Sequence, residues 1–147
     1  MMLKTLNPTA GTRGIRVESA LREAMISDYP KVAVRELLIN AIMHRNYQSN
    51  APVRFYWFPD HIEINNPGGL YGEASPKNFP YAVGYRNPVI AEAIRVLGYT
   101  NRFGQGVLRA RKALEINQSP PAKFTFDPHW FSVRIEARAA NGVLGQE

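Results

Sequence analysis

Three side chains that could take part in catalysis recur at a regular spacing in the first half of the chain. Glu36, Asn40 and His44 are each four residues apart, so in a helix they share one face. An amide oxygen is a suitable ligand for Mg²⁺, which also takes waters and phosphate oxygens. A carboxylate one turn earlier can accept a proton from an attacking water. Asn40 is therefore a candidate magnesium ligand, and Glu36 is a candidate general base.

The same three residues also fit a helix face that simply meets solvent. Exposed helix faces are routinely built from such side chains. His44 has no HExxH or similar metal-ligand spacing around it, and by itself it is more typical of a packing or turn residue. A binding site is the better interpretation only if other parts of the chain supply matching elements.

Two glycine-containing turns are such elements. Residues 65–70 read Asn-Asn-Pro-Gly-Gly-Leu and follow an expected strand, whereas residues 104–106 read Gly-Gln-Gly and precede an expected helix. Glycine lets the backbone approach a ligand closely, and a helix N-terminus presents free N–H groups to phosphate. Either turn, taken alone, is also an ordinary turn sequence. The chain has no Gly-x-x-x-x-Gly-Lys-Ser/Thr segment, so it lacks the P-loop that helicase motors need.

The spacing of apolar residues predicts the elements that must position these groups. Helices are expected over residues 31–47, 88–97 and 107–116, and strands over 52–58, 62–66, 123–126 and 131–137. Residues 15–26 predict a short strand followed by a helix. The polar stretch from 67 to 88 is a long loop, of the kind that often forms a lid. This order predicts an α/β fold, a two-layer α/β sandwich with a mixed sheet and helices on one face.

Composition limits the classes of protein that the chain can belong to. Its 147 residues, 45% hydrophobic and 20% charged, fit one globular domain. Cysteine is absent, which excludes disulfides, thiolate zinc sites and cysteine nucleophiles. Because no apolar run is long enough for a membrane span and the N-terminus lacks a secretory signal, we expect no membrane association and a cytoplasmic protein. The net charge of +6 favours anionic partners, although only Arg109, Arg111 and Lys112 form a tight basic group.

Four segments, taken in order, resemble motifs of the GHKL ATPases. The most similar versions are those at the C-terminal end of RecG-related helicases and transcriptional regulators. Residues 36–47 (ELLINAIMHRNY) resemble the N-box helix, and residues 65–70 resemble the G1 turn. Residues 86–88 with the helix after them resemble the lid exit, and residues 102–107 resemble the G2 turn. The similarity covers about Pro30 to Ile135, which is most of the chain.

This resemblance implies a Bergerat fold, in which ATP lies between helices and a mixed sheet beneath a mobile lid. It implies that Asn40 holds Mg²⁺ and bridges to the phosphates, that Glu36 is the general base, and that Asn66 takes the place of the adenine-reading Asp. Glycines that would let the backbone approach the base and phosphates are Gly68, Gly104 and Gly106. The function implied is an ATP-binding domain with weak Mg-dependent ATPase activity. Helicase activity of this chain alone is not expected.

Two departures from the family pattern bear on nucleotide affinity. Asn66 stands where most GHKL proteins have Asp, and Leu70 stands where a second Gly is usual. An amide can accept the adenine amino proton through its carbonyl, but it can also present its NH₂ group instead. The usual upstream DNA-binding domain is also missing, which predicts a fragment or a stand-alone remnant.

Two non-catalytic functions are alternatives. The first is a DNA-associated regulator that keeps the fold without the chemistry. The second is a protein-interaction module, which would use the aromatic side chains of the long loop: Tyr71, Phe79, Tyr81 and Tyr85. The expected organisation is an irregular lead-in over residues 1–13, a GHKL-like domain over 14–138 with its lid at about 67–88, and a disordered tail over 139–147.

Overall fold

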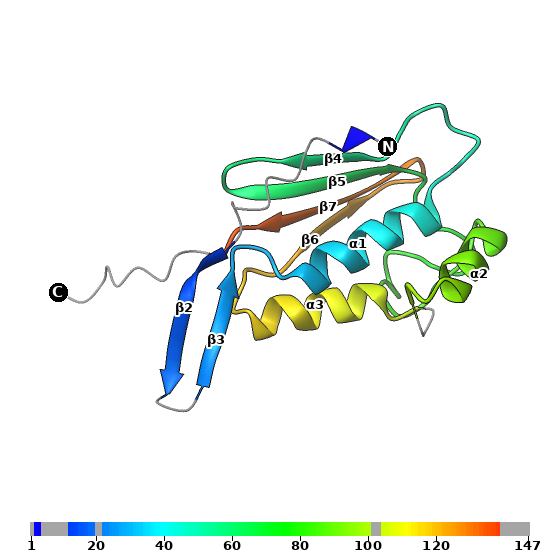
Figure 1. The fold of residues 1–147 in the computed structure, drawn as a ribbon. Coiled ribbons are helices and arrows are strands. Elements are labelled where there is room, and N and C mark those ends of the chain that lie inside the picture. The colour runs from blue at the N-terminus through cyan, green and yellow to red at the C-terminus, as the bar shows by residue number, and fades with distance from the viewer. Residues whose placement is uncertain (1, 4–11, 20–21, 101–103, 139–147) are drawn as a thin grey trace.

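The computed structural model describes residues 2–3, 12–19, 22–100 and 104–138 (Figure 1). The strands are β1 (Met2–Leu3), β2 (Thr12–Ser19), β3 (Arg22–Ser27), β4 (Arg54–Trp57), β5 (His61–Pro67), β6 (Lys123–Phe126) and β7 (Trp130–Glu136). The helices are α1 (Lys31–His44), α2 (Pro88–Val96) and α3 (Gly106–Ile116). Within the described ranges, no helix is both long and apolar enough to cross a membrane.

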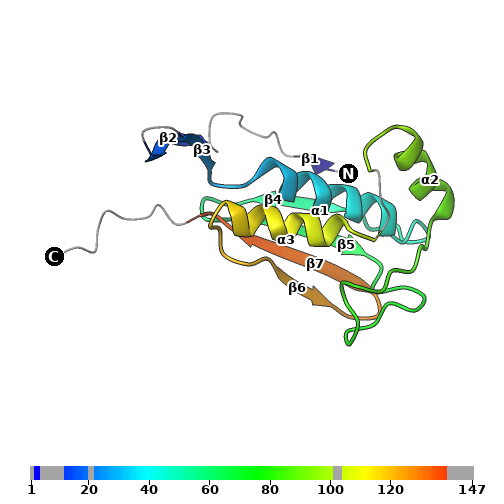
Figure 2. The same ribbon diagram turned by 90° about the horizontal axis from the view of Figure 1, so that it is seen from below.

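Five strands form a mixed sheet in the order β1-β4-β5-β7-β6. β1 runs parallel to β4, and the other neighbouring pairs are antiparallel. α1 and α3 lie side by side against one face of this sheet, as the two views in Figures 1 and 2 agree. The predicted α/β two-layer sandwich, with a mixed sheet and its helices on one face, is therefore confirmed.

The core lies between the sheet and the two long helices. Successive side chains of a strand point to opposite faces, and the inward ones here are apolar. From the strands these are Phe55, Ile62, Ile64, Val133 and Ile135. The helices contribute Ala33, Leu37, Ala41, Ala110 and Leu114. Because Ala33 and Ala110 are fully buried and small, α1 and α3 can pack closely against each other.

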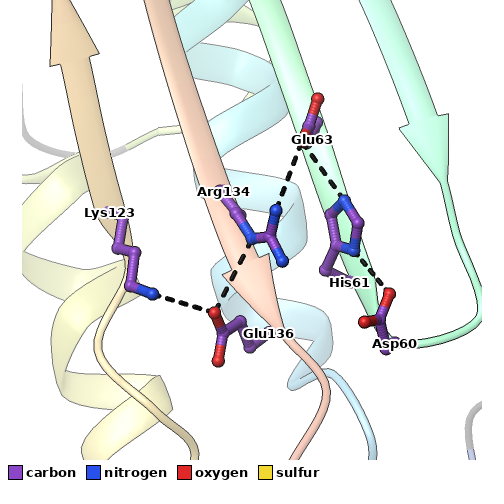
Figure 3. Close-up of polar contacts among 6 residues, drawn as sticks. All are labelled: Asp60, His61, Glu63, Lys123, Arg134 and Glu136. Atoms are coloured by element: carbon purple, nitrogen blue, oxygen red, sulfur yellow. Dashed lines mark hydrogen bonds and ion pairs between the residues drawn. The ribbon is translucent and has the colours of Figure 1, made fainter.

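The opposite face of the sheet carries charged side chains in a cross-strand network (Figure 3). Lys123 Nζ lies 2.9 Å from Glu136 Oε1, and Arg134 lies between Glu136 and Glu63. His61 bonds to Asp60 and to Glu63 on its two ring nitrogens. Exposed ion pairs of this kind contribute little to stability. No group of three or more His, Cys, Asp or Glu side chains in the described part of the chain could hold a metal ion.

The N-terminal hairpin differs from the prediction for residues 15–26. β2 pairs with β3 in an antiparallel hairpin, so the helix expected after the first strand is wrong. Leu21 and Met25 are four residues apart, which fits a helix, but pairing with a neighbouring strand overrides a weak local preference. Figure 1 shows this hairpin projecting away from the five-stranded sheet.

The predicted domain boundaries coincide only partly with what the structure describes. Within the expected irregular lead-in of residues 1–13, residues 2–3 belong to β1 and residues 12–13 to β2. The other lead-in residues, and the tail expected to be disordered over 139–147, lie outside the described residues. The boundaries of the GHKL-like domain, 14–138, remain a prediction.

Candidate functional site

A cavity of about 740 Å³, part of which is open to solvent, lies between α1, the start of α3 and the loop of residues 68–87. Glu36, Asn40 and His44 all line this cavity. The face of α1 that the sequence indicates for its chemistry thus borders the cavity.

The apolar stripe of α1 explains why these side chains point there. Leu37 and Ala41 are buried in the core with exposures of 1% and 2%. Each follows Glu36 or Asn40 by one position, and successive helix residues are turned by about 100°. With the Leu37 and Ala41 side chains fixed against the sheet, Glu36 and Asn40 are directed toward α3 and the cavity.

The carboxylate of Glu36 is held by an arginine from another helix. Arg109 of α3 donates from Nε to Glu36 Oε1 and from Nη2 to Glu36 Oε2, each over 3.0 Å. Arg109 Nη2 also donates to Thr100 Oγ1 over 3.2 Å. Glu36 is buried, with 8% of its surface exposed. Two parallel charge-assisted bonds of this kind fix the carboxylate strongly and specifically.

Arg109 and Thr100 are the site residues that the motifs did not indicate. Both line the cavity, and Arg109 is 73 positions from Glu36 in the sequence. The one sequence signal was the basic group formed by Arg109, Arg111 and Lys112, which begins one turn into the helix that follows the second glycine turn.

His44, which lines the cavity, also packs against the loop of residues 68–87. Its ring stacks on Tyr85 with centroids 5.7 Å apart. Burial lowers the pKa of His44, the charge of Arg86 lowers it further, and a hydrogen bond with the backbone of Gly84 acts in the opposite direction. The stacking on Tyr85 and the lowered pKa agree with the packing role that the sequence favours for His44.

The second glycine turn borders the cavity directly. Gly104, with φ of +77°, and Gly106 both line it. A Cβ on Gly106 would lie 3.2 Å from Glu36 Oε2. α3 begins at Gly106 and has no side-chain cap. Its first N–H groups thus have no intrahelical acceptor, and they stand where a phosphate can approach them.

At the first glycine turn, the space that a side chain would fill is taken by other parts of the protein. A Cβ on Gly68, whose φ is +111°, would lie 3.0 Å from the backbone nitrogen of Asn46 and 3.3 Å from the carbonyl oxygen of His44. A Cβ on Gly69 would overlap the carbonyl oxygen of Asp127. Gly69 lines the cavity, whereas Gly68 does not. Glu36, Asn40, Gly104 and Gly106 meet at the cavity, and Gly68 lies apart from them.

Asn66 is buried at the end of β5. Only 1% of its surface is exposed, and neither Oδ1 nor Nδ2 has a hydrogen-bond partner among the described residues. It is paired across the sheet with Phe131, which lines the cavity, although Asn66 itself does not. A buried amide without partners costs free energy.

The loop of residues 68–87 is fixed at both ends near the C-terminus of α1. Asn46 N–H donates to the carbonyl oxygen of Pro67 over 2.7 Å. At the other end, Asn87 Nδ2 donates to the carbonyl oxygens of Met43 and Arg45, over 3.0 and 2.6 Å. Asn87 thus caps the end of α1, which stops at His44, three residues before the predicted end.

Two of the four loop aromatics are packed against the domain. The Phe79 ring lies 5.1 to 5.8 Å from the rings of Phe124, Phe126 and Phe131, and Tyr85 stacks on His44. Tyr71 and Tyr81 are the exposed ones. The interaction-module hypothesis therefore keeps only half of its proposed contact residues.

Comparison with known proteins gives the family. The sequence profile described as "Putative ATP-dependent DNA helicase recG C-terminal" matches residues 50–135, more than half of the chain. The chain belongs to this family. This confirms the resemblance to RecG-related proteins that the motifs indicate. Membership of the family supports the interpretation as an ATPase-type domain. The match includes Asn66 and both glycine turns, and it begins after α1.

A solved structure has the same fold as this RecG C-terminal family domain. The DIP2311 protein from Corynebacterium diphtheriae matches with a TM-score of 0.73 and 24% identity. The alignment covers 85% of this chain and 26% of that protein, so the chain corresponds to about a quarter of the solved protein's length. A search of curated proteins gives no significant match.

Proposed function

We propose that this domain binds ATP together with Mg²⁺ in the cavity between α1, the start of α3 and the loop of residues 68–87. The observation that carries the proposal is the convergence of Glu36, Asn40, Gly104 and Gly106 on this one cavity. The family description, which names an ATP-dependent helicase, is consistent with it.

The residues present fit both the nucleotide and the ion. Asn66 does not line the cavity, but Phe131, its partner across the sheet, does. The Asn66 amide, which has both donor and acceptor atoms without a partner, is the proposed partner of the amino group and ring nitrogen of adenine. Asn40 offers an amide oxygen to Mg²⁺, which takes its remaining ligands from waters and phosphate oxygens and therefore needs no acidic cluster.

Each residue has a role that follows from its chemistry. The free N–H groups at the start of α3 bind phosphate oxygens, and Gly104 and Gly106 let the phosphates come near. Mg²⁺, when bound, neutralises phosphate charge. Glu36 is the proposed general base of a weak ATPase. Helicase activity is not proposed for this chain, because it has no P-loop.

A titration with ATP and Mg²⁺, followed by backbone amide NMR, tests nucleotide binding. We expect saturable shifts at Asn40, Asn66 and Gly104. Asn40→Ala should weaken binding about tenfold or more, because a lost ligand contact of about 1.4 kcal/mol is a factor of ten. Asn50→Ala removes an exposed amide outside the cavity and should change nothing. No shift at these three residues with millimolar ATP would reject the proposal.

A second proposal is association with DNA, by the domain itself or through another part of a longer protein. The net charge of +6 and the family description favour it. Binding of a fluorescent duplex should weaken steeply as salt rises. Glu36→Ala should leave this binding unchanged, because the buried carboxylate contributes nothing to a surface contact. Failure to bind at low salt would exclude direct association.

A further inference from the structure

Arg109 on α3 contacts the proposed general base, Glu36 on α1, at the wall of the cavity. The Arg109 side chain is one-third exposed, whereas that of Glu36 is 10% exposed. Both oxygens of Glu36 accept from one edge of the guanidinium, through Nε and Nη2. The pair therefore has a buried acidic member and a basic member that solvent, or a ligand, can reach.

The position of Arg109 on α3 places it beside the proposed phosphate site. It lies one turn after Gly106, where the helix begins, and both residues line the cavity. A guanidinium binds phosphate in the same two-pronged manner as carboxylate. An anion bound to the N–H groups at the start of α3 therefore lies close to Arg109.

Each oxygen of Glu36 already accepts a bond from Arg109, so a water in the cavity must compete with the guanidinium for the carboxylate. A phosphate group of the ligand carries more negative charge than the carboxylate and competes with it for the same guanidinium edge.

We propose that Arg109 is an anion-binding residue of this cavity that exchanges partners. Without ligand it holds Glu36, and with ligand it bonds the polyphosphate and releases Glu36 to act as a base. This inference rests on the proposed function, and it names the residue that couples phosphate binding to the readiness of Glu36. Thr100, which also accepts from Arg109, keeps the guanidinium on the cavity wall during the exchange.

The test uses inorganic tripolyphosphate, which lacks a base, and follows the Nε–Hε signal of Arg109 by NMR. We expect this signal to shift in the wild-type protein as tripolyphosphate is added, while the melting temperature rises. Arg109→Gln should weaken tripolyphosphate binding about tenfold or more. Arg111→Gln is the matched control, because Arg111 lies on the same helix but over the rings of Phe79 and Phe124.

Exchange makes a second prediction of opposite sign. Glu36→Gln removes the competing carboxylate and should strengthen tripolyphosphate binding several-fold. Removing a negative charge alone could do this, so the substitution is repeated in the Arg109→Gln background. If Arg109 exchanges partners, most of the gain in tripolyphosphate affinity must disappear in the Arg109→Gln background, because the effects of substitutions at coupled residues are not additive. Arg109→Lys keeps the charge without the two-pronged geometry, and it serves if Arg109→Gln does not fold.

The outcomes separate this inference from the proposed function. If ATP gives no shift at Asn40, Asn66 and Gly104, both fail. If ATP and tripolyphosphate bind but the Arg109 signal does not move, or if the gain from Glu36→Gln persists without Arg109, the exchange is overturned and ATP binding stands.

Discussion

The two glycine turns each contain two glycines, but they differ in what lies beside these glycines. At Gly68 and Gly69, the space of a side chain is taken by backbone atoms of the end of α1 and of the β6–β7 turn. At Gly104 and Gly106, the nearest atoms are ends of side chains, and the space borders the cavity. Glycine thus serves close packing of the chain on itself in one turn and access to a cavity in the other.

The largest expected effect is on folding, from Gly69→Ala in the first turn. Its Cβ would overlap the Asp127 carbonyl, and neither backbone segment can move without disturbing the hairpin. We expect a loss of about 3 kcal/mol or more in the free energy of unfolding, measured by urea denaturation.

Gly98→Ala is the control for this substitution. Gly98 also needs glycine, with φ of +77°, but nothing lies within 4 Å of its missing side chain. Gly98→Ala should therefore lower the free energy of unfolding by only about 1 kcal/mol, which is the cost of the backbone strain. Equal losses for Gly69→Ala and Gly98→Ala would contradict the assignment of the first turn to packing.

A smaller effect, on binding more than on folding, is expected from Asn66→Ala at the beginning of the first turn. Because the amide has no partner in the protein, its loss should destabilise the free domain less than Ile64→Ala does. That control truncates another inward side chain of β5, and it should cost about 2–5 kcal/mol.

The two substitutions should affect the affinity for ATP in the reverse order. Asn66→Ala should weaken it about tenfold, or about 1.4 kcal/mol, by isothermal titration, while Ile64→Ala should change it little as long as the domain is folded. A normal affinity in Asn66→Ala would show that the first turn takes no part in the ligand site.

The smallest effect on stability is expected from Gly106→Ala in the second turn. Its Cβ would press on Glu36 Oε2 from 3.2 Å, and a carboxylate can turn aside by a few tenths of an ångström. Alanine also favours the helix by about 1 kcal/mol over glycine, so the free energy of unfolding should stay within about 1 kcal/mol. The affinity for tripolyphosphate should change by a few-fold. A loss as large as that of Gly69→Ala would remove the distinction between the turns.

Helices and strands with a regular apolar spacing could be predicted from the sequence, because that spacing is a local property. α2 and α3 begin within one residue of the expected positions, and β6 has the expected bounds. The layered fold followed from their order. The β2–β3 hairpin could not be predicted, because its second strand is fixed by a pairing partner and not by its own residues.

The site could be predicted only as far as its helix face. The i+4 spacing of Glu36, Asn40 and His44 was enough to bring them to one wall. No local pattern says which helix lies opposite, so the pairing of Glu36 with Arg109 required the packing of α1 on α3. The different surroundings of Gly68 and Gly106 are equally non-local, since each depends on atoms far away in the chain.

The capping of α1 by Asn87, together with the bond between Asn46 and Pro67, closes the loop of residues 68–87 at one helix terminus. Both of its ends are fixed to the same helix terminus. The entropy of closing a loop grows slowly, by roughly 0.6 kcal/mol for each doubling of its length. Changes in the length of this loop that leave Gly69 and Phe79 in place should therefore cost the fold little. Variation confined to it would change what enters the cavity while Glu36 and Asn40 stay in place.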